Sequence, residues 1–183
     1  MTFGAVYAVL LAALFVRVRT TADPAAPGPV WVMPGEPIRL VRLHHALFYL
    51  VLLGAPVEAL ALGSRPSGQV AGAALLAVGV VLYRTAGRAL GASLSPLVEP
   101  RPGATLATTG LYGRVRHPMY AGQMLIAVGA PLTVGARVLL PVAMVAIAVL
   151  LRRIALEEAA LRRTFPEFSR YATTTKRLVP GVY

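Results

Sequence analysis

The stretch HHALFYLVLLGAPVEALAL, residues 44–62, decides the fold class, because Glu58 is the only charged side chain in an otherwise apolar run. A helix of about 20 such residues crosses the hydrocarbon core of a bilayer. The stretch therefore predicts a transmembrane helix. An acidic residue inside a span is a functional candidate by default, but Glu58 lies near one end of the run and could instead reach water or pair with Arg65.

Four more apolar runs have the length and the Leu, Ala and Val content of helices. Several are shorter than the roughly 20 residues of a perpendicular span, and arginines at their ends can extend the effective length by snorkelling. We expect an all-α polytopic integral membrane protein with about five transmembrane helices and a cytoplasmic C-terminal helix. Four spans with one buried or re-entrant helix is the alternative. The four runs are residues 2–16, 69–83, 119–134 and 138–151.

Composition excludes several classes of protein. The 183 residues are 57% hydrophobic and only 14% charged, unlike a soluble domain, and the absence of Cys excludes disulfides and thiolate chemistry. A net charge of +11 could suit nucleic acid, but the basic residues lie between apolar runs and form no known module, so no nucleic-acid partner is expected.

The adjacent His44 and His45 lie on different helix faces, and no HExxH spacing occurs, so we expect no metal site. Rossmann and P-loop signatures are also missing.

The positions of the basic residues predict the orientation in the membrane. With five spans, 16 of the 18 Lys and Arg residues fall on one side, and only Arg65 and Arg137 on the other. This bias predicts a bacterial-type cytoplasmic membrane protein with its N-terminus outside and its C-terminus in the cytoplasm. Residues 20–37 are expected to form an irregular loop with Trp31 at the interface. The turns at 63–68 and 135–137 should each join two helices into a tight antiparallel hairpin.

Polar residues gather in the stretch GLYGRVRHPMYAG, residues 110–122, just before the fourth run. Pro118 suits the first turn of that helix, where its missing N–H leaves no bond unmade. A helix N-terminus also offers free N–H groups to a carboxylate or phosphate. The alternative is an interfacial belt of Tyr and Arg that anchors the helix.

A second cluster follows the fifth run, where Glu158 falls on a helical stripe of apolar side chains: Leu151, Ile154, Leu161 and Phe165. A carboxylate on a buried face needs a partner, so Glu158 is a candidate site residue. The alternative is a pair of surface ion pairs, Arg153 with Glu157 and Glu158 with Arg162, each contributing about 0.3 to 0.5 kcal/mol. That alternative is favoured for Glu157 alone.

These two clusters together resemble the isoprenylcysteine carboxyl methyltransferase family and its relatives among the membrane phospholipid methyltransferases. The first shows Gly-x-Tyr followed by Arg-His-Pro-x-Tyr-x-Gly. The second, EEAALRRTFPEFSRYATTTKRLVPG at residues 157–181, shows a Glu-Glu pair and a basic-apolar-Pro ending. The likeness covers about residues 90–180, and an apolar hairpin separates the clusters as in that family.

The resemblance implies a membrane enzyme that uses S-adenosylmethionine. Its methyltransferase core would be residues 84–183, and residues 1–83, with the first three transmembrane helices, would form the lipid-acceptor side. Carried over by position, Arg116 would orient the acceptor and act in catalysis with Glu158. Gly122 would let the cofactor approach closely. The implied cofactor-binding residues are Tyr112, His117, Pro118, Tyr120, Gly122, Glu157 and Glu158.

The acceptor implied by the resemblance is a lipophilic molecule, best matched by an isoprenoid-type carboxylate that is already ionised at neutral pH. A phospholipid amine or a thiol is the alternative, and either would have to lose a proton to His117 or a glutamate. Transfer would depend mainly on holding donor and acceptor in near-attack geometry. A membrane reductase using NADPH, and a non-catalytic scaffold or small transporter, are the competing functions.

Overall fold

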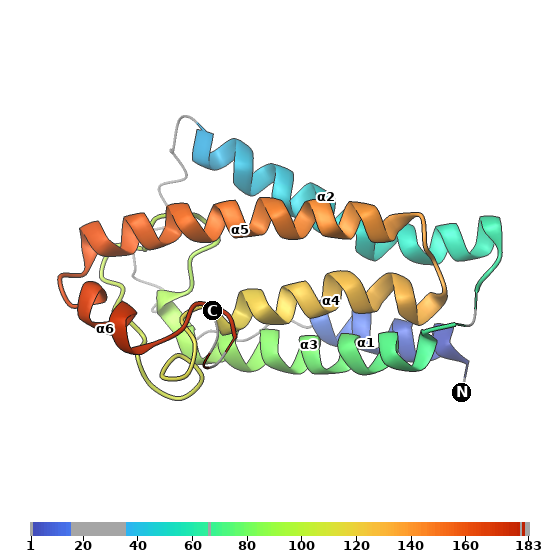
Figure 1. The fold of residues 1–183 in the computed structure, drawn as a ribbon, viewed down its shortest axis with the longest axis horizontal. Helices are drawn as coiled ribbons and strands as arrows, with labels where there is room; N and C mark the ends of the chain where they lie inside the picture. The colour runs from blue at the N-terminus through green and yellow to red at the C-terminus, as the bar shows by residue number, and fades with distance from the viewer. Residues whose placement is uncertain (1, 16–35, 66, 180, 182–183) are drawn as a thin grey trace.

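The computed structural model describes residues 2–15, 36–65, 67–179 and 181, and every regular element in these ranges is helical. Figure 1 shows the five longer helices lying side by side, with the short α6 at the end opposite the N-terminus. Trp31, with most of the loop predicted at 20–37, lies outside the described residues. The elements are α1 (Phe3–Phe15), α2 (Glu36–Leu62), α3 (Gln69–Leu90), the 3₁₀ turn η1 (Gly91–Ser93), α4 (Pro118–Val134), α5 (Leu139–Thr164) and α6 (Phe168–Thr174).

Three helices are long and apolar enough to cross a membrane, at Pro37–Leu62, Gln69–Ser93 and Leu139–Thr164. Large apolar side chains such as Leu60 and Val81 are exposed on them, as expected for surfaces that face lipid. The predicted all-α polytopic membrane protein is thus confirmed. With 13 and 17 residues, α1 and α4 are shorter than a perpendicular span of about 20, so five complete spans stay a prediction.

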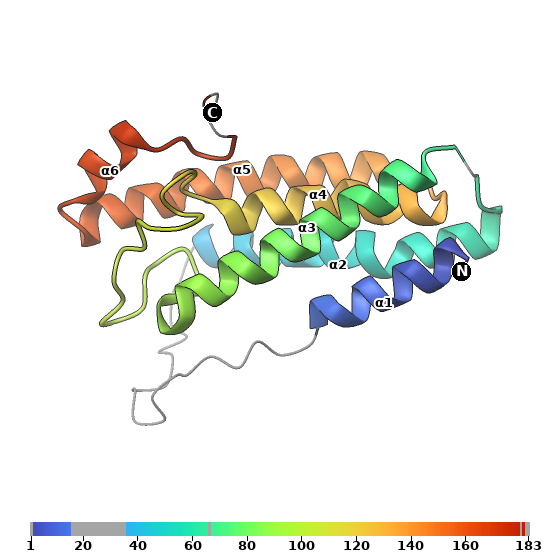
Figure 2. The ribbon, with the colours of Figure 1, turned by 90° about the horizontal axis from the view of Figure 1, so that it is seen from below.

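The helices pack around α4, which contacts α1, α2, α3 and α5. Eleven of its 17 residues are buried. The two views in Figures 1 and 2 show α2 and α5 along one side of α4, with α3 and α1 along another. The expected hairpin of α4 and α5 is present. The one expected for α2 and α3 is wrong, because in the described ranges α3 packs against α4 and α2 against α5.

Glycines bring α3 and α4 into backbone contact. A Cβ added at Gly79 would lie 2.8 Å from the carbonyl oxygen of Gly122, and one at Gly122 only 2.7 Å from the backbone nitrogen of Tyr83. The same kind of contact between the two helices recurs seven residues away on each of them. There, a Cβ at Gly129 would lie 2.9 Å from the carbonyl oxygen of Gly72. Small residues allow such close approach between membrane helices. The start of α4, with its polar motif, is therefore fixed against α3.

Glu58 caps the N-terminus of α5. Its carboxylate accepts hydrogen bonds from the backbone N–H groups of Arg137, Val138 and Leu139, at 2.6, 2.7 and 3.0 Å. In the described residues Glu58 does not form the ion pair with Arg65 that was one alternative, because the unpaired N–H groups and partial positive charge of a helix start offer a carboxylate several donors at once. Glu58 therefore ties the end of α2 to the start of α5.

Candidate functional site

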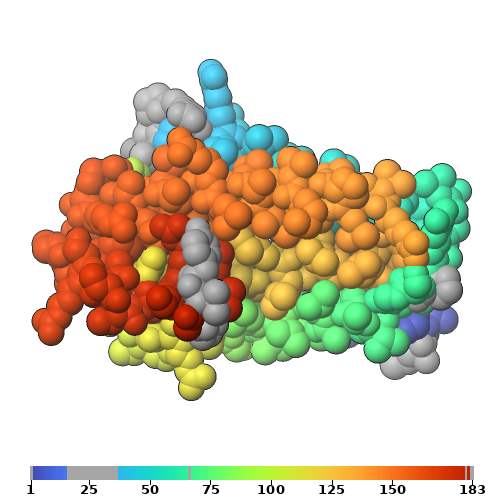
Figure 3. Space-filling model, viewed as in Figure 1, coloured from blue at the N-terminus to red at the C-terminus, as the bar shows by residue number. Residues whose placement is uncertain are grey.

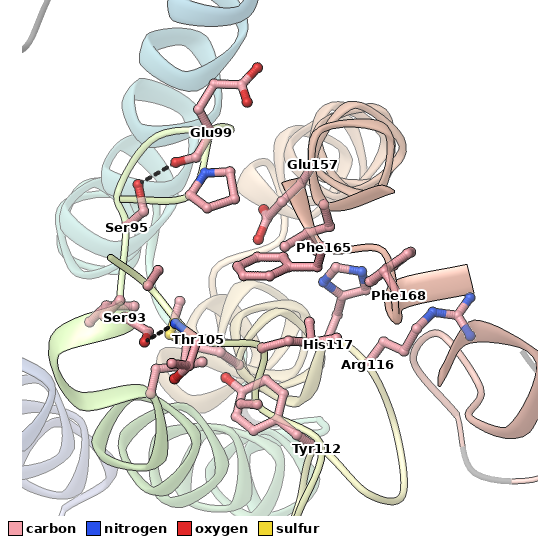
Figure 4. Close-up of a pocket in the computed structure, with 18 of the residues that line it drawn as sticks. Ser93, Ser95, Glu99, Thr105, Tyr112, Arg116, His117, Glu157, Phe165 and Phe168 are labelled. Carbon is pink, nitrogen blue, oxygen red and sulfur yellow. Dashed lines mark hydrogen bonds between the residues drawn. The ribbon is translucent and has the colours of Figure 1, made fainter. Parts of the chain in front are cut away.

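A cavity lies at the end of the bundle opposite the N-terminus, where the 91–117 loop, the second half of α5 and α6 come together (Figure 3). Its wall combines polar groups with a large apolar surface. Figure 4 shows Glu157 and Phe165 on one side and Ser93, Thr105 and Tyr112 on the other. The apolar part of the wall comprises Leu90, Leu94, Leu97, Val98, Leu106, Met119, Leu161, Phe165 and Phe168.

The polar motif enters α4 as predicted from Pro118, which occupies the first turn after the N-cap residue His117. The backbone N–H groups of Arg116 and His117 donate to the carbonyl oxygens of Lys176 and Arg177, at 2.8 and 3.0 Å. The C-terminal segment thus lies beside the motif like a short parallel strand. Two stretches of chain about 60 residues apart are fixed together at the edge of the cavity.

Glu158 is buried, with 1% of its surface exposed, and binds several side chains at once. Its carboxylate accepts from Nε of Arg116 at 2.9 Å and lies 3.3 Å from Nε2 of His117. Arg177 contacts both carboxylate oxygens, at 3.1 and 2.8 Å, while the predicted contact with Arg162 is longer, at 3.8 Å. The prediction of a buried, partnered Glu158 is confirmed, but its carboxylate joins parts of the protein and does not line the cavity.

Arg116 lines the cavity but directs its guanidinium elsewhere. Besides Glu158, it donates to the carbonyl oxygens of Ala172, at 3.0 Å, and Thr175. Figure 4 shows the group directed toward the C-terminal segment. Its predicted role in orienting an acceptor stays a prediction, and its contacts in the structure join the motif to that segment.

Glu157 faces the cavity and accepts a 2.5 Å hydrogen bond from the Tyr120 hydroxyl. The Tyr120 ring stacks on His117, with 5.6 Å between ring centroids. The predicted surface ion pair with Arg153 is wrong, because that arginine is buried and contacts His44. In the described part of the chain no Lys or Arg lies within ion-pair distance of Glu157. The cavity therefore has one carboxylate without a compensating cation.

Two tyrosines on the far side of the cavity remain protonated at neutral pH. The Tyr171 hydroxyl donates to the carbonyl oxygen of Tyr112 at 2.5 Å, and burial raises its pKa to about 12. Burial, and then the charge of Glu157, raise the pKa of Tyr112 well above its ordinary range. Both hydroxyls are consequently hydrogen-bond donors at any physiological pH.

A comparison with protein families identifies the family of this chain. A model described as phospholipid methyltransferase matches residues 68–167, which is more than half of the 183-residue chain.

The chain belongs to the phospholipid methyltransferase family.

It is therefore a membrane enzyme that uses S-adenosylmethionine, as the sequence predicted, and the scaffold, transporter and reductase alternatives are set aside. Membership in the isoprenylcysteine carboxyl methyltransferase family itself stays a prediction. No curated protein matches the chain.

The matched region of this methyltransferase contains α3, α4 and α5, with the whole of the first sequence cluster and the Glu-Glu start of the second. It ends before α6 and before the segment that binds Arg116 and Glu158. The predicted boundary between residues 83 and 84 falls inside α3, and the division into an acceptor side and a core stays a prediction.

The donor set of the cavity fits S-adenosylmethionine. Its sulfonium and ammonium are cationic, which suits the uncompensated carboxylate of Glu157. The protonated phenol of Tyr112 suits the cofactor's hydroxyls and carboxylate, and in this structure it donates to the carbonyl oxygen of Ala86 over a long 3.4 Å. Its flat purine suits an apolar wall such as that formed by Leu161 and Phe165.

Besides Glu158, two predicted cofactor residues of the methyltransferase, Pro118 and Gly122, do not line this cavity. The side of Gly122 where a Cβ would stand is occupied by the backbone of α3. Their cofactor roles stay predictions, and the contacts seen are a helix start and a helix–helix contact.

Sequence reasoning missed the loop that forms the opposite wall of the cavity. The Ser95 hydroxyl donates to the carbonyl oxygen of Glu99 at 2.9 Å, and Ser93 accepts from the backbone N–H of Thr105 at 3.2 Å. Arg163 on α5 forms an exposed ion pair with Glu99 at 2.9 Å. Such a loop carries no hydrophobic period, and only its Ser and Pro content marks it as a turn.

Proposed function

We propose that this cavity binds S-adenosylmethionine and that the enzyme methylates the amine of a phospholipid headgroup. The observation that carries the proposal is the carboxylate of Glu157, which faces the cavity with a tyrosine hydroxyl as its hydrogen-bond donor and no cation beside it in the described residues. Such a site attracts cationic groups. It suits a cofactor and a headgroup that both carry positive charge.

Among the acceptors predicted from the sequence, the electrostatics favour the amine over the isoprenoid-type carboxylate. A carboxylate acceptor needs a cationic partner in the cavity, and the proposed one was Arg116. In the structure the hydrogen bonds of its guanidinium go to Glu158, Ala172 and Thr175. A carboxylate acceptor would also meet the negative charge of Glu157.

The bound cofactor would supply a methyl group on a sulfonium, whose sulfur keeps the bonding electron pair when the methyl leaves. The residues of the chain would bind and orient: Glu157 holds a cationic group, Tyr112 turns its hydroxyl from the carbonyl oxygen of Ala86 to the ligand, and the apolar wall near Leu97 takes the lipid side of the acceptor. Alignment of this kind can account for about 7 kcal/mol or more of the barrier. The amine nitrogen must be neutral to attack, so its proton has to leave before the new N–C bond forms.

The C-terminal end of the bundle, with its cavity, is proposed to face the cytoplasm. In support, Arg65 and Arg137 lie in the turns at the opposite end, while the other basic residues of the described ranges belong to segments at the cavity end or leading to it. Cytoplasmic loops of membrane proteins carry such an excess of Lys and Arg.

A methyl-transfer assay with the purified enzyme, labelled S-adenosylmethionine and lipid vesicles tests the proposal. Phosphatidylethanolamine should gain label, and its rate should rise between pH 6 and 9 as more of the amine loses its proton. An isoprenoid carboxylate offered in the same vesicles should react slowly or not at all. Label on the carboxylate only, with a flat pH profile, would overturn the choice of acceptor. Absence of cofactor binding would overturn the whole proposal.

A further inference from the structure

Arg153 is a buried cation on α5, one turn before Glu157, with 3% of its surface exposed. One guanidinium nitrogen lies 3.3 Å from Nδ1 of His44, and another donates to the carbonyl oxygen of Pro96 at 2.7 Å. The guanidinium carbon lies over the ring of Tyr120, 5.4 Å from its centroid. Its partners therefore belong to α2, to the cavity loop and to α4.

A buried arginine with these contacts costs free energy in a helix that crosses a membrane. In the ranges that the structure describes, no carboxylate lies within ion-pair distance of Arg153, and its Nε has no hydrogen-bond partner. A buried cation without a counter-charge costs free energy that a well-packed apolar side chain would avoid. Ionisable residues in such positions usually mark function.

The contacts of Arg153 lie directly behind the wall of the cavity. The ring of Tyr120 is stacked by the imidazole of His117 and also lies under the guanidinium. The Tyr120 hydroxyl in turn donates to Glu157. A cation over an aromatic face is attracted by the negative charge of that face, and more strongly where water is excluded. Arg153 is thus one of the groups that contact this ring, together with His117.

The second contact reaches the loop on the other side of the cavity. Pro96, whose carbonyl accepts from Arg153, stands between the cavity residues Ser95 and Leu97. His44 is 1% exposed, and its Nδ1 can accept from the guanidinium only as the neutral imidazole. Neutral His44 therefore fixes Arg153 from the side of α2 without adding a second charge.

We propose that Arg153 is a positioning residue of this methyltransferase. Fixed by His44, it orients the ring of Tyr120 and through its hydroxyl the carboxylate of Glu157 that faces the cavity. This inference rests on the proposed function, because it requires that ligands bind beside Glu157.

The test compares Arg153→Met, which keeps the length but removes the charge, with Arg153→Lys and with Arg152→Met at the exposed neighbouring position. Each full-length variant is purified, and its dissociation constant for S-adenosylmethionine and its thermal midpoint are measured. Arg153→Met should bind S-adenosylmethionine about tenfold or more weakly, because a misplaced Glu157 loses a contact between charged groups of about that value. Its thermal midpoint should stay level or rise, since an uncompensated charge has left the interior. The affinity of Arg153→Lys should lie between those of Arg153→Met and the parent. Arg152→Met should have the affinity of the parent.

A double-mutant cycle with Tyr120→Phe shows whether the effect passes through that hydroxyl. The loss caused by Arg153→Met should largely vanish in the Tyr120→Phe background. Fully additive losses would overturn the inference, as would parent-like binding by Arg153→Met, or affinity and thermal midpoint falling together in both Arg153 variants.

Glu157→Gln, measured in parallel, separates this inference from the proposed function. Parent-like affinity in Glu157→Gln would contradict the proposed cavity itself. A loss in Glu157→Gln with none in Arg153→Met would overturn only the positioning role.

Discussion

The Tyr120 hydroxyl donates to Oε2 of Glu157 over 2.5 Å, and together the two side chains form a polar pair on the cavity wall. The adjacent Glu158 is instead enclosed by three arginines and His117. Successive residues of a helix point about 100° apart. Because of that angle, the two adjacent carboxylates point in different directions. Glu157 faces the cavity, and Glu158 faces the C-terminal segment.

Glu157→Gln should weaken the binding of S-adenosylmethionine by about tenfold or more while leaving the thermal midpoint within a degree or two. The amide keeps the shape and the hydrogen bond but loses the charge, and a hydrogen bond to a charged group contributes about 1.5 to 3 kcal/mol. Isothermal titration calorimetry in detergent measures the affinity. Glu167→Gln, which makes the same change at an exposed position that does not line the cavity, is the matched control.

Glu158→Gln should act mainly on stability. Removing the charge leaves Arg116 and Arg177 beside a neutral group, and breaking a buried ion pair costs on the order of 3 kcal/mol. We expect a lower thermal midpoint and faster proteolysis of the C-terminal segment, because Glu158 holds it to the motif. A variant with parent stability and lost cofactor binding would instead return Glu158 to the ligand site.

Gly122→Ala should destabilise the enzyme, since the new methyl would overlap the backbone of α3 near Tyr83. Gly87→Ala is the matched control, because its methyl would meet only the sulfur of Met119 at 3.6 Å. Replacing a helical glycine that has room should stabilise by about 0.5 to 1 kcal/mol. The thermal midpoint should fall in Gly122→Ala and rise in Gly87→Ala. Similar shifts in the two variants would contradict the close contact of α3 with α4.

The stability of the enzyme should fall at high pH partly through Tyr171, whose pKa is raised by burial to about 12. Below about pH 10, the ordinary value for Tyr, both folded and unfolded states hold the proton and its contribution is complete. Between pH 10 and 12 only the unfolded state releases it, so unfolding is favoured. Thermal midpoints from pH 8.5 to 11.5 should drop less steeply in Tyr171→Phe, and equal slopes would contradict the assignment.

The proposed orientation can be read with single cysteines, because the chain has none of its own. A membrane-impermeant maleimide added to intact cells should label Ser67→Cys, in the turn between α2 and α3. It should label Thr108→Cys, in the cavity loop, only after the cells are opened. Both positions are exposed in the structure. The reverse pattern would place the cavity on the outer side.

Local patterns predicted much of this molecule. Apolar runs located the five longer helices, and Pro118 located the start of α4. The helical stripe through Ile154 and Leu161 correctly placed Glu158 in the interior. Each of these rests on spacing within one segment, which sequence periodicity records directly.

Contacts between residues far apart in the sequence could not be predicted from such local patterns. Nothing near Arg153 indicates that His44, about a hundred residues earlier, would turn it away from Glu157. Arg177 was likewise counted only as a basic residue, although it contacts both oxygens of Glu158. Which helices become neighbours depends on tertiary packing, and these contacts follow from it.

The cap that Glu58 forms on α5 also bears on how deep Glu157 lies in the membrane. Eighteen residues separate Leu139, at the capped start, from Glu157, which is about 27 Å along a helix axis. The hydrocarbon thickness of a typical bilayer is about 30 Å. If the capped start of α5 lies at one membrane face, Glu157 falls close to the opposite face. Under the proposed function, the thickness of the host membrane, and so the length of its acyl chains, would then decide how well a headgroup amine meets this carboxylate.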